Sequence, residues 1–376
     1  MGVKPVLFVT GHAPAYRVGA LARLHEREEI ELALFGGRLQ HGGAAFDAEP
    51  PFPHRHVRPH ELYALAASGT YRAVVCPTGG RLAPLATWAG ARRAGVPLIL
   101  WASLWAHPRS AAHALTYLPL RRLYRSADAV VTYGPHVSAY VAARGARNVH
   151  IAPQSVDNDF WRAPVLAPPS DPRWPAAADV RFLFVGRPAA GKGLPMLVSA
   201  WRAARLGSAK AALVLAGVGA DFALAGLGSN LAAPDGGAGA PGAPIVCLEA
   251  LAPPALRAVY AACDVLVVPS EPTRTFREPW GLVVNEAMNR GLAVIATDAV
   301  GAAAGGLVRD GENGLVVAAG DGRALAGAIE RLAGDRQLRE RMGSAGHADV
   351  LAFSHDAWAE GFSRALASVG VSRGRC

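Results

Sequence analysis

The sequence is poor in cysteine and in long apolar runs, and each shortage argues against a class of protein. Only 4 of the 376 residues are cysteines, they are widely scattered, and no Cys-x-x-Cys occurs, which disfavours a disulfide scaffold or a cysteine-bound metal. No stretch reaches the roughly 18 consecutive apolar residues of a membrane-spanning helix, and the longest candidate, residues 94–106, predicts a buried strand. The N-terminus lacks the apolar region of a secretory signal, so we expect a cytoplasmic protein with reduced thiols.

The apolar content is sufficient for two folded domains. Hydrophobic residues make up 51% of the chain and charged residues 18%, which excludes a disordered chain. At about 100 to 200 residues per domain, the length predicts two domains, each with its own core.

Short apolar runs alternate with helical segments in two series. Runs such as residues 6–10 and 265–268 are apolar at consecutive positions, which is typical of parallel sheets covered on both faces. A proline-rich stretch, residues 164–175, separates the two series and predicts a linker. We therefore expect Rossmann-like domains at residues 1–165 and 166–355. The other predicted strands are residues 73–76, 97–100, 129–132, 181–185, 212–216, 245–248, 293–296 and 315–317.

Local signals predict details of the second half. Asp321 and Asp335 are expected to cap two helices, with Gly334 ending the first. Residues 356–368 carry apolar side chains at a spacing of four and predict a final amphipathic helix. Residues 233–244 are rich in glycine and proline and predict a flexible surface loop.

Positive charge is concentrated in the first half. The chain has a net charge of +9; residues 1–165 hold 18 Lys and Arg against 10 Asp and Glu, whereas residues 166–376 hold 20 against 19. Such a surface could attract anionic lipid, acidic substrates or nucleic acid. Only 3 of the 38 basic residues are lysines, so a generally basic surface that reflects genome composition is the alternative.

A glycine-rich turn lies between the strand predicted at residues 181–185 and a helix with Pro195 near its first position. Strand, turn and helix together predict a phosphate cradle, because the amides of a helix N-terminus attract an anion. The spacing Gly-x4-Gly-Lys also fits most of a P-loop, but Gly193 occupies the position of the serine or threonine that would bind magnesium. A P-loop hydrolase and a purely structural turn stay open as alternatives. The turn contains Gly186, Arg187, Gly191, Lys192 and Gly193.

Two glutamates bracket a second predicted helix N-terminus. Glu278 precedes the helix, and Glu286 is expected about one and a half turns inside it. This pattern suits a phosphate with hydroxyl groups on either side, because the free amides attract an anion and carboxylates accept hydrogen bonds. In the alternative, Glu278 only complements the helix dipole and Glu286 is a solvated surface residue.

These motifs resemble those of the family 4 retaining glycosyltransferases, which have the GT-B fold. Glu278-x7-Glu286 is similar to the paired-glutamate motif of that family, and Gly186-Arg187 with Lys192 is similar to its diphosphate-binding turn. The resemblance covers residues 180–320, and the N-terminal half is similar mainly in architecture. It implies an α/β protein with two Rossmann-like domains facing across a cleft. The C-terminal helix, residues 356–376, would then pack back on the N-terminal domain.

The resemblance also implies roles for single residues. Arg187 and Lys192 would neutralise the donor diphosphate, Glu278 would contact the sugar hydroxyls, and Glu286 would bind the ribose hydroxyls. His107 would lie near the sugar, with an ordinary hydrogen-bonded loop histidine as the alternative. The other expected donor contacts are Gly186, Pro279, Trp280, Gly281, Leu282, Val283, Gly217 and, after the first strand, Gly11.

The activity implied is that of a retaining hexosyltransferase, which moves a sugar from a nucleotide diphosphate sugar to a hydroxyl acceptor in glycan, glycolipid or cell-surface polysaccharide biosynthesis. UDP is the first expectation for the nucleotide and GDP the second. No cofactor and no divalent metal are expected, and His54, His56 and His60 are expected to be loop residues rather than ligands.

The expected partners are the nucleotide-sugar donor and a hydroxyl acceptor, with a lipid-linked acceptor among the candidates. The basic N-terminal domain could bring peripheral contact with the inner face of an anionic membrane, and no nucleic acid is expected. A P-loop nucleotide hydrolase and a non-catalytic nucleotide-sugar-binding subunit are the competing functions.

Overall fold

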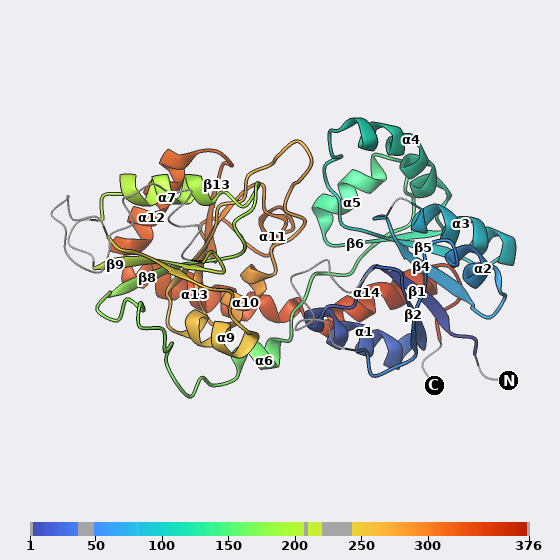
Figure 1. Cartoon of the computed structure of the whole chain (residues 1–376), viewed down its shortest axis with the longest axis horizontal. Helices are drawn as coiled ribbons and strands as arrows, with labels where there is room; N and C mark the ends of the chain where they lie inside the picture. Colours follow the sequence, from blue (N-terminus) through green and yellow to red (C-terminus); the bar gives the residue numbers. More distant parts are fainter. Residues whose placement is uncertain (1–2, 37–48, 81, 207–209, 220–242, 374–376) are drawn as a thin grey trace. The chain divides into compact units, whose positions relative to one another are not determined.

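A computed structural model of the chain describes residues 3–36, 49–80, 82–206, 210–219 and 243–373. The chain divides into two compact units (Figure 1): unit 1 comprises residues 1–157 and 352–376, and unit 2 comprises residues 158–351. The first division falls after Asp157, before the proline-rich stretch, because helix α6 (Asn158–Arg162) packs against α10 (Val283–Asn289) of unit 2. None of the described helices is both long and apolar enough to span a membrane.

Unit 1 is built on a seven-stranded parallel sheet with the strand order β3-β2-β1-β4-β5-β6-β7. Strand β1 (Val6–Thr10) lies inside the sheet, where Val6 pairs with Ile30 on one side and Ala73 on the other. All five of its residues are buried, which explains the continuous apolar run in the sequence. The other strands are β2 (Ile30–Leu34), β3 (His54–His56), β4 (Ala73–Pro77), β5 (Leu98–Ala102), β6 (Ala129–Thr132) and β7 (Val149–Ile151).

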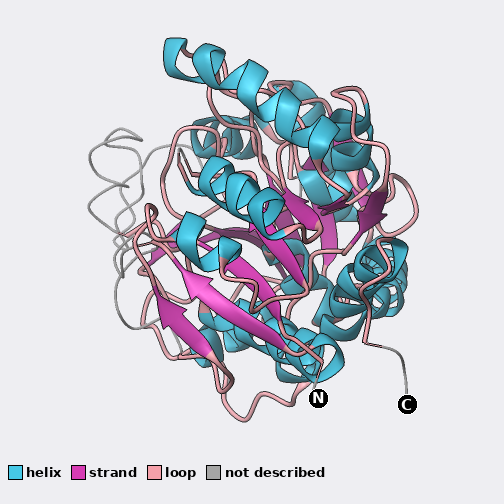
Figure 2. Ribbon diagram, turned by 90° about the vertical axis from the view of Figure 1, so that its right-hand side faces the viewer, coloured by secondary structure: helices cyan, strands magenta, loops and turns pink. Residues whose placement is uncertain are grey.

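Helices cover both faces of this sheet, as Figure 2 shows. Helix α14 (His355–Ser368) packs against α1 (Ala15–Glu28) within unit 1, and its Trp358, Phe362 and Leu366 are fully buried. The opposite face is covered by α2 (Leu62–Ala67), α3 (Ala83–Ala94), α4 (Ala111–Ser126) and α5 (Pro135–Ala142).

One expectation about unit 1 is wrong. His54 and His56 do not lie in a loop but form the two ends of β3, which pairs with β2 through His54 opposite Leu32. The strand is short and polar because it is an edge strand, so the sequence pattern did not indicate it. His60 lies in the turn that follows.

Unit 2 is built on a six-stranded parallel sheet with the order β10-β9-β8-β11-β12-β13. A hydrophobic core lies between the sheet and helices α7 (Leu194–Ala203), α12 (Gly322–Gly334) and α13 (Arg336–Asp349). The other elements are β8 (Val180–Val185), β9 (Ala211–Ala216), β10 (Ile245–Leu248), α9 (Pro253–Ala261), β11 (Val265–Val268), β12 (Ala293–Thr297), α11 (Gly301–Ala304), β13 (Gly314–Val317) and the 3-10 turn Val350–Ala352.

The predicted capping of two helices in unit 2 is confirmed. Asp321 accepts a hydrogen bond from the Ala324 amide and Asp335 accepts one from the Leu338 amide, each at 2.8 Å. The glycine-rich loop predicted at residues 233–244 lies outside the described residues, except for its last two.

The strand order of unit 2 determines which turns meet. Strand β8 lies between β9 and β11, so the turns that follow these three parallel strands emerge at one edge of the sheet. Ligands of open parallel sheets bind at this carboxyl edge.

Candidate functional site

The turns after β8 and β9 are joined at the carboxyl edge of the unit 2 sheet. The amide of Gly186 donates to the carbonyl of Ala216 at 3.0 Å, and the amide of Gly217 donates to the carbonyl of Leu248 at 3.0 Å. A Cβ atom at Gly217 would lie 3.1 Å from the carbonyl oxygen of Gly186. The structure therefore brings together two glycines that the sequence placed in a donor site.

Gly193 holds the glycine-rich turn against the end of β11. Its φ is 67°, and a Cβ atom there would lie 1.8 Å from the carbonyl oxygen of Pro269. A serine or threonine does not fit this position without a shift of the backbone. The geometry thus opposes the P-loop alternative, which needs a hydroxyl group at this point of the turn.

Lys192 and Glu278 form an ion pair across the site. The Nζ of Lys192 lies 2.5 Å from Oε2 of Glu278, and the two side chains are 32% and 9% exposed. Because a buried carboxylate is costly unless it is paired, Lys192 explains how Glu278 is accommodated in the fold. Glu278 therefore does more than complement a helix dipole.

Two hydroxyl residues that the sequence analysis did not select support this pair. The Oγ of Ser270 donates to Oε2 of Glu278 at 3.4 Å, and the Oγ1 of Thr297 donates to the carbonyl of Ser270 at 2.5 Å. Both hydroxyl residues are buried. The available signal was their positions: Ser270 lies two residues after β11 and Thr297 ends β12, and both strands end at the same edge.

Arg187 supplies a second cation at this edge. It follows Gly186 directly and is exposed, and its guanidinium forms no hydrogen bond or ion pair with any of the described residues. Nearby, the Nζ of Lys192 lies 5.9 Å from the centre of the Phe276 ring. The turn after β8 therefore presents one paired and one unpaired cation.

The segment before α10 carries free backbone amides. Gly281 has a φ of 92°, and α10 begins at Val283. No hydrogen bond from the amides of Gly281, Leu282 or Val283 is found within the described ranges. Free amides of this kind favour an anion, as the sequence predicted.

Trp280 contributes its backbone rather than its side chain to this segment. Its ring is buried, and Nε1 donates to Oδ1 of Asn285 at 2.8 Å. Pro279 is approached closely by α11, because a Cβ atom at Gly301 would lie 2.0 Å from the Pro279 carbonyl oxygen.

Glu286 lies in the first turn of α10, not one and a half turns inside it. The helix starts later than predicted because Gly281 has a positive φ, which is not helical. The hydroxyl of Tyr260 donates to Oε2 of Glu286 at 2.7 Å. Burial raises the pKa of Glu286 to about 7, and the hydrogen bond from Tyr260 opposes this rise. Glu286 is therefore not a solvated surface residue, and Tyr260 is a further site residue that the sequence analysis missed.

The two predicted site residues of unit 1 lie after different strands. The Nε2 of His107 donates to the carbonyl of His113 at 2.9 Å, and the Tyr140 hydroxyl lies 3.5 Å from its Nδ1. Gly11 follows β1, and its carbonyl accepts a hydrogen bond from the Gly36 amide at 2.8 Å. Both ring nitrogens of His107 thus have partners inside unit 1, and roles for His107 and Gly11 toward a ligand remain predictions.

Among the residues that the structure describes, no three His, Cys, Asp or Glu side chains are grouped so as to hold a metal ion.

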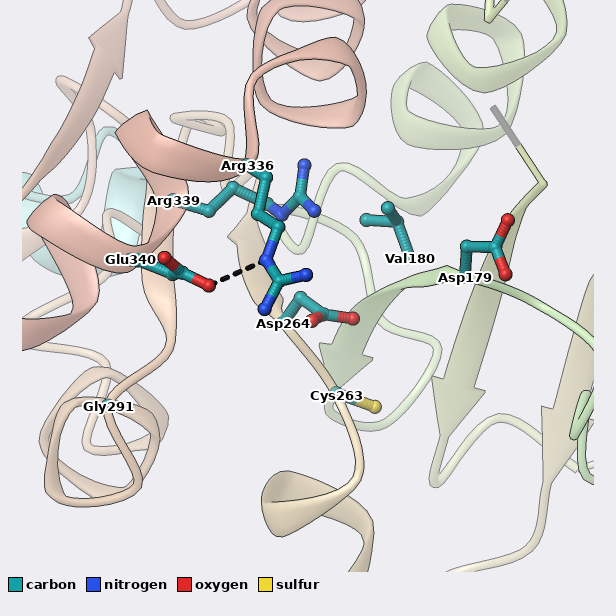
Figure 3. A pocket seen from close by; sticks show the side chains of 8 residues that line it. All are labelled: Asp179, Val180, Cys263, Asp264, Gly291, Arg336, Arg339 and Glu340. Atoms are coloured by element: carbon teal, nitrogen blue, oxygen red, sulfur yellow. Dashed lines mark hydrogen bonds and ion pairs between the residues drawn. The ribbon is translucent and has the colours of Figure 1, made fainter. Parts of the chain in front are cut away.

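A cavity of about 560 Å³ lies apart from the candidate site, at the amino ends of β8, β11 and β12 and opposite the carboxyl edge (Figure 3). Arg336 and Glu340 form an ion pair of 2.7 Å in its wall. The other lining residues are Asp179, Val180, Cys263, Asp264, Gly291 and Arg339.

A glycosyltransferase family model matches a segment of unit 2. Residues 179–335 match the family model described as "Glycosyl transferases group 1". The lipopolysaccharide core biosynthesis glycosyltransferase LpsE of Rhizobium meliloti is 37% identical over 113 residues, which are 30% of this chain and 31% of that protein. The D-inositol 3-phosphate glycosyltransferase of Nocardia farcinica is 38% identical over 132 residues, 33% of this chain and 28% of that protein. The chain thus spans about three tenths of the length of these relatives.

Solved structures are similar to the whole chain. Sucrose-phosphate synthase from Thermosynechococcus elongatus has a TM-score of 0.70 at 20% identity, with 96% of this chain and 98% of that chain covered. Anabaena HepE in complex with UDP and glucose has a TM-score of 0.70 at 18% identity, with 98% and 100% covered. At such identities the likeness shows the fold alone. The chain therefore has the GT-B fold, with two Rossmann-like domains built on parallel sheets.

Proposed function

We propose that the chain is a retaining glycosyltransferase that takes a sugar from a nucleotide diphosphate sugar bound at the carboxyl edge of unit 2. The observation that carries this proposal is the Lys192–Glu278 ion pair beside two glycine turns and the unpaired Arg187. The similarity of the chain to group 1 glycosyltransferases over residues 179–335 supports the same assignment.

The cations and free amides of the site suit a departing nucleoside diphosphate. When the bond between the sugar and the phosphate breaks, negative charge develops on the leaving oxygens. Arg187, Lys192 and the amides at residues 281–283 would stabilise this charge more in the transition state than in the bound donor, which is the condition for faster reaction. We propose that these groups take the place of a divalent metal.

The two glutamates suit the hydroxyl groups on either side of the diphosphate. Glu278 keeps one oxygen on Lys192 and would accept from the sugar hydroxyls. Glu286 keeps Oε2 on Tyr260 and would accept from the ribose hydroxyls through its other oxygen. We propose retention by attack of the acceptor hydroxyl on the face from which the diphosphate departs, with the departing phosphate accepting the proton and no protein nucleophile.

Proposals for the nucleotide and the biosynthetic process draw on the similar proteins. The HepE structure contains UDP and glucose, and we propose UDP as the nucleotide of this chain, with GDP second. We propose that unit 1 binds the acceptor. The names of the relatives support glycan or glycolipid biosynthesis. We further propose a cytoplasmic protein that touches the inner face of an anionic membrane through the basic unit 1.

A thermal-shift experiment in EDTA tests the donor site. A ligand present at about 100 times its Kd stabilises the folded state by about 2.7 kcal/mol, so UDP or UDP-sugars should raise the melting temperature while NAD does not. The variant Lys192→Met should lose this response, and Arg336→Met, in the cavity at the opposite edge, should keep it. A response to ATP that requires magnesium and is absent with UDP and GDP would refute the proposal.

A turnover assay then separates an enzyme from a nucleotide-sugar-binding subunit. An enzyme releases UDP or GDP from its sugar donor, with the acceptor identified in a screen or with water as a slow acceptor. Release should continue in EDTA, since Arg187 and Lys192 supply the positive charge. A chain that binds the donor and transfers its sugar to no acceptor of any class would be a binding subunit.

A further inference from the structure

Helix α4 of unit 1 exposes two leucines beside two arginines. Leu115 is 81% exposed and Leu118 is 69% exposed, and Arg122 and Arg125 are also exposed. These four residues follow the spacing of 3, 4 and 3, so they form one stripe along the helix. Figure 1 places α4 at the rim of unit 1. The helix therefore turns an apolar half and a cationic half toward solvent.

Helix α3 also exposes a leucine and an arginine. Leu85 is 40% exposed, and Trp88 and Arg92 follow it at the spacing of one helix face. The guanidinium carbons of Arg92 and Arg122 lie 5.6 Å and 5.9 Å from the Trp88 ring centre. Trp88 thus joins the two helices, and their exposed residues form one surface. We call it the α3–α4 surface: Leu85, Arg92, Leu115, Leu118, Arg122 and Arg125.

No carboxylate on this part of the chain neutralises the arginines. Residues 62–127 contain no aspartate and no glutamate, and Asp128 accepts a hydrogen bond from the Leu98 amide at 2.8 Å. Within the described ranges, Arg92, Arg122 and Arg125 form no ion pair. Elsewhere in unit 1 the pattern differs, since Arg72 lies 2.9 Å from Glu28.

We propose that the α3–α4 surface docks on an anionic lipid bilayer. Unpaired arginines are attracted to anionic headgroups, and exposed leucines on the same helices gain by entering the boundary between headgroups and acyl chains. A nucleic acid would match the arginines but not the aliphatic side chains, because single strands are bound by stacking on aromatic rings and duplexes mainly through phosphates. A bilayer is the partner that satisfies both halves of the stripe.

This inference deepens the proposed membrane contact and rests on that part of the proposed function, not on sugar transfer. The binding assay contains no nucleotide, so it reports on the surface whether or not the chain is a transferase. Release of UDP with a water-soluble acceptor, measured separately, reports on the donor site without a membrane.

Co-sedimentation with vesicles tests the proposal on the full chain. The vesicles are phosphatidylcholine alone or equal parts of phosphatidylcholine and phosphatidylglycerol. The wild type should bind the mixed vesicles at low salt and release them at high salt, because screening weakens the attraction of the arginines. The double variant Arg122→Glu/Arg125→Glu should bind the mixed vesicles at least about tenfold more weakly. The double variant Leu115→Ser/Leu118→Ser should also bind at least about tenfold more weakly.

Matched variants in unit 2 provide controls. Arg331→Glu/Arg341→Glu changes the net charge equally at two exposed positions on α12 and α13. Leu166→Ser/Leu351→Ser removes two exposed leucines, 98% and 52% exposed, outside the α3–α4 surface. Both controls should bind like the wild type, and unchanged melting temperatures verify the folding of all four variants.

Three results would overturn the proposal. The first is wild-type binding that is equal on both kinds of vesicle, or absent from both. The second is a loss of binding in the unit 2 controls as large as in the α4 variants. The third is a wild type that is dimeric in solution and becomes monomeric in Leu115→Ser/Leu118→Ser, because a second copy would then cover the leucines.

Discussion

Replacing Lys192 by methionine removes the positive charge that accompanies Glu278 and keeps most of the aliphatic chain. The carboxylate of Glu278 is 9% exposed, so the variant leaves an almost buried charge with the Ser270 hydroxyl as a remaining donor. Breaking a fully buried pair costs about 3 to 5 kcal/mol, but Lys192 is 32% exposed and water can partly replace it. We therefore expect the free energy of unfolding to fall by about 1 to 3 kcal/mol.

The same substitution should affect turnover through a different cause. If Lys192 stabilises the leaving diphosphate, its loss removes a preorganised charge, and kcat should fall by about 100-fold to 1000-fold. Urea unfolding measures the stability, and release of UDP or GDP from the donor measures kcat. The variant should remain folded, because the expected loss is smaller than the stability of a typical domain.

The double variant Lys192→Met/Glu278→Gln separates the two effects. It removes both charges, so most of the lost stability should return relative to Lys192→Met, whereas kcat should stay low. The single variant Glu278→Gln completes this double-mutant cycle. The control is the same cycle at the exposed pair Arg336–Glu340, with Arg336→Met and Glu340→Gln. Near-normal turnover in Lys192→Met, or turnover that returns together with stability in the double variant, would refute a direct role of Lys192 in catalysis.

Two further predictions concern the same edge of unit 2. Because burial raises the pKa of Glu286 from 4.5 to about 7, the folded state holds this proton more tightly than the unfolded state. The contribution of Glu286 to the free energy of unfolding is therefore fully present below pH 4.5 and is lost as the pH rises through about 7. Unfolding at a series of pH values should show a fall of about 3 kcal/mol that Glu286→Gln removes, and an equal fall in Glu286→Gln would contradict the assignment. Gly193→Ser should lower the free energy of unfolding by about 3 kcal/mol or more, because its Cβ meets the Pro269 carbonyl at 1.8 Å, and urea unfolding that matches the wild type would show that the turn has room for a side chain.

Much of the fold could be predicted because buried parallel strands leave a local signature. Residues 6–10, 129–132, 245–248 and 265–268 were predicted as strands with the observed bounds, since a strand covered on both faces is apolar at every position. Helix caps were equally local, because the Asp321 and Asp335 side chains bond amides three residues later in the sequence.

Other elements depended on neighbours that the sequence does not place. Strands β3 and β7 have three residues each and lie at the two edges of the unit 1 sheet. Their strand character comes from hydrogen bonds with β2 and β6 rather than from an apolar pattern. The late start of α10 likewise depends on the conformation of Gly281, which moves Glu286 into the first turn.

The candidate site could likewise be predicted in part from the sequence, and the rest depended on the fold. The residue types and their order along the chain predicted the glycine-rich turn, its cations and the two glutamates, because phosphate and hydroxyl recognition needs these groups. The sheet order decided that Lys192 meets Glu278, since β8 and β11 are neighbours and the turns after them share one edge. Packing of α9 against α10 decided that Tyr260 holds Glu286.

The surface of unit 1 could also be predicted only in part from the sequence. The sequence by itself determined that the first half is basic and that residues 62–127 lack acidic side chains. Only the tertiary structure decided which apolar residues of α4 are buried and which are exposed, because Leu123 packs in the core while Leu115 and Leu118 face solvent. Composition is a property of the chain, but exposure depends on which face of each helix the sheet covers.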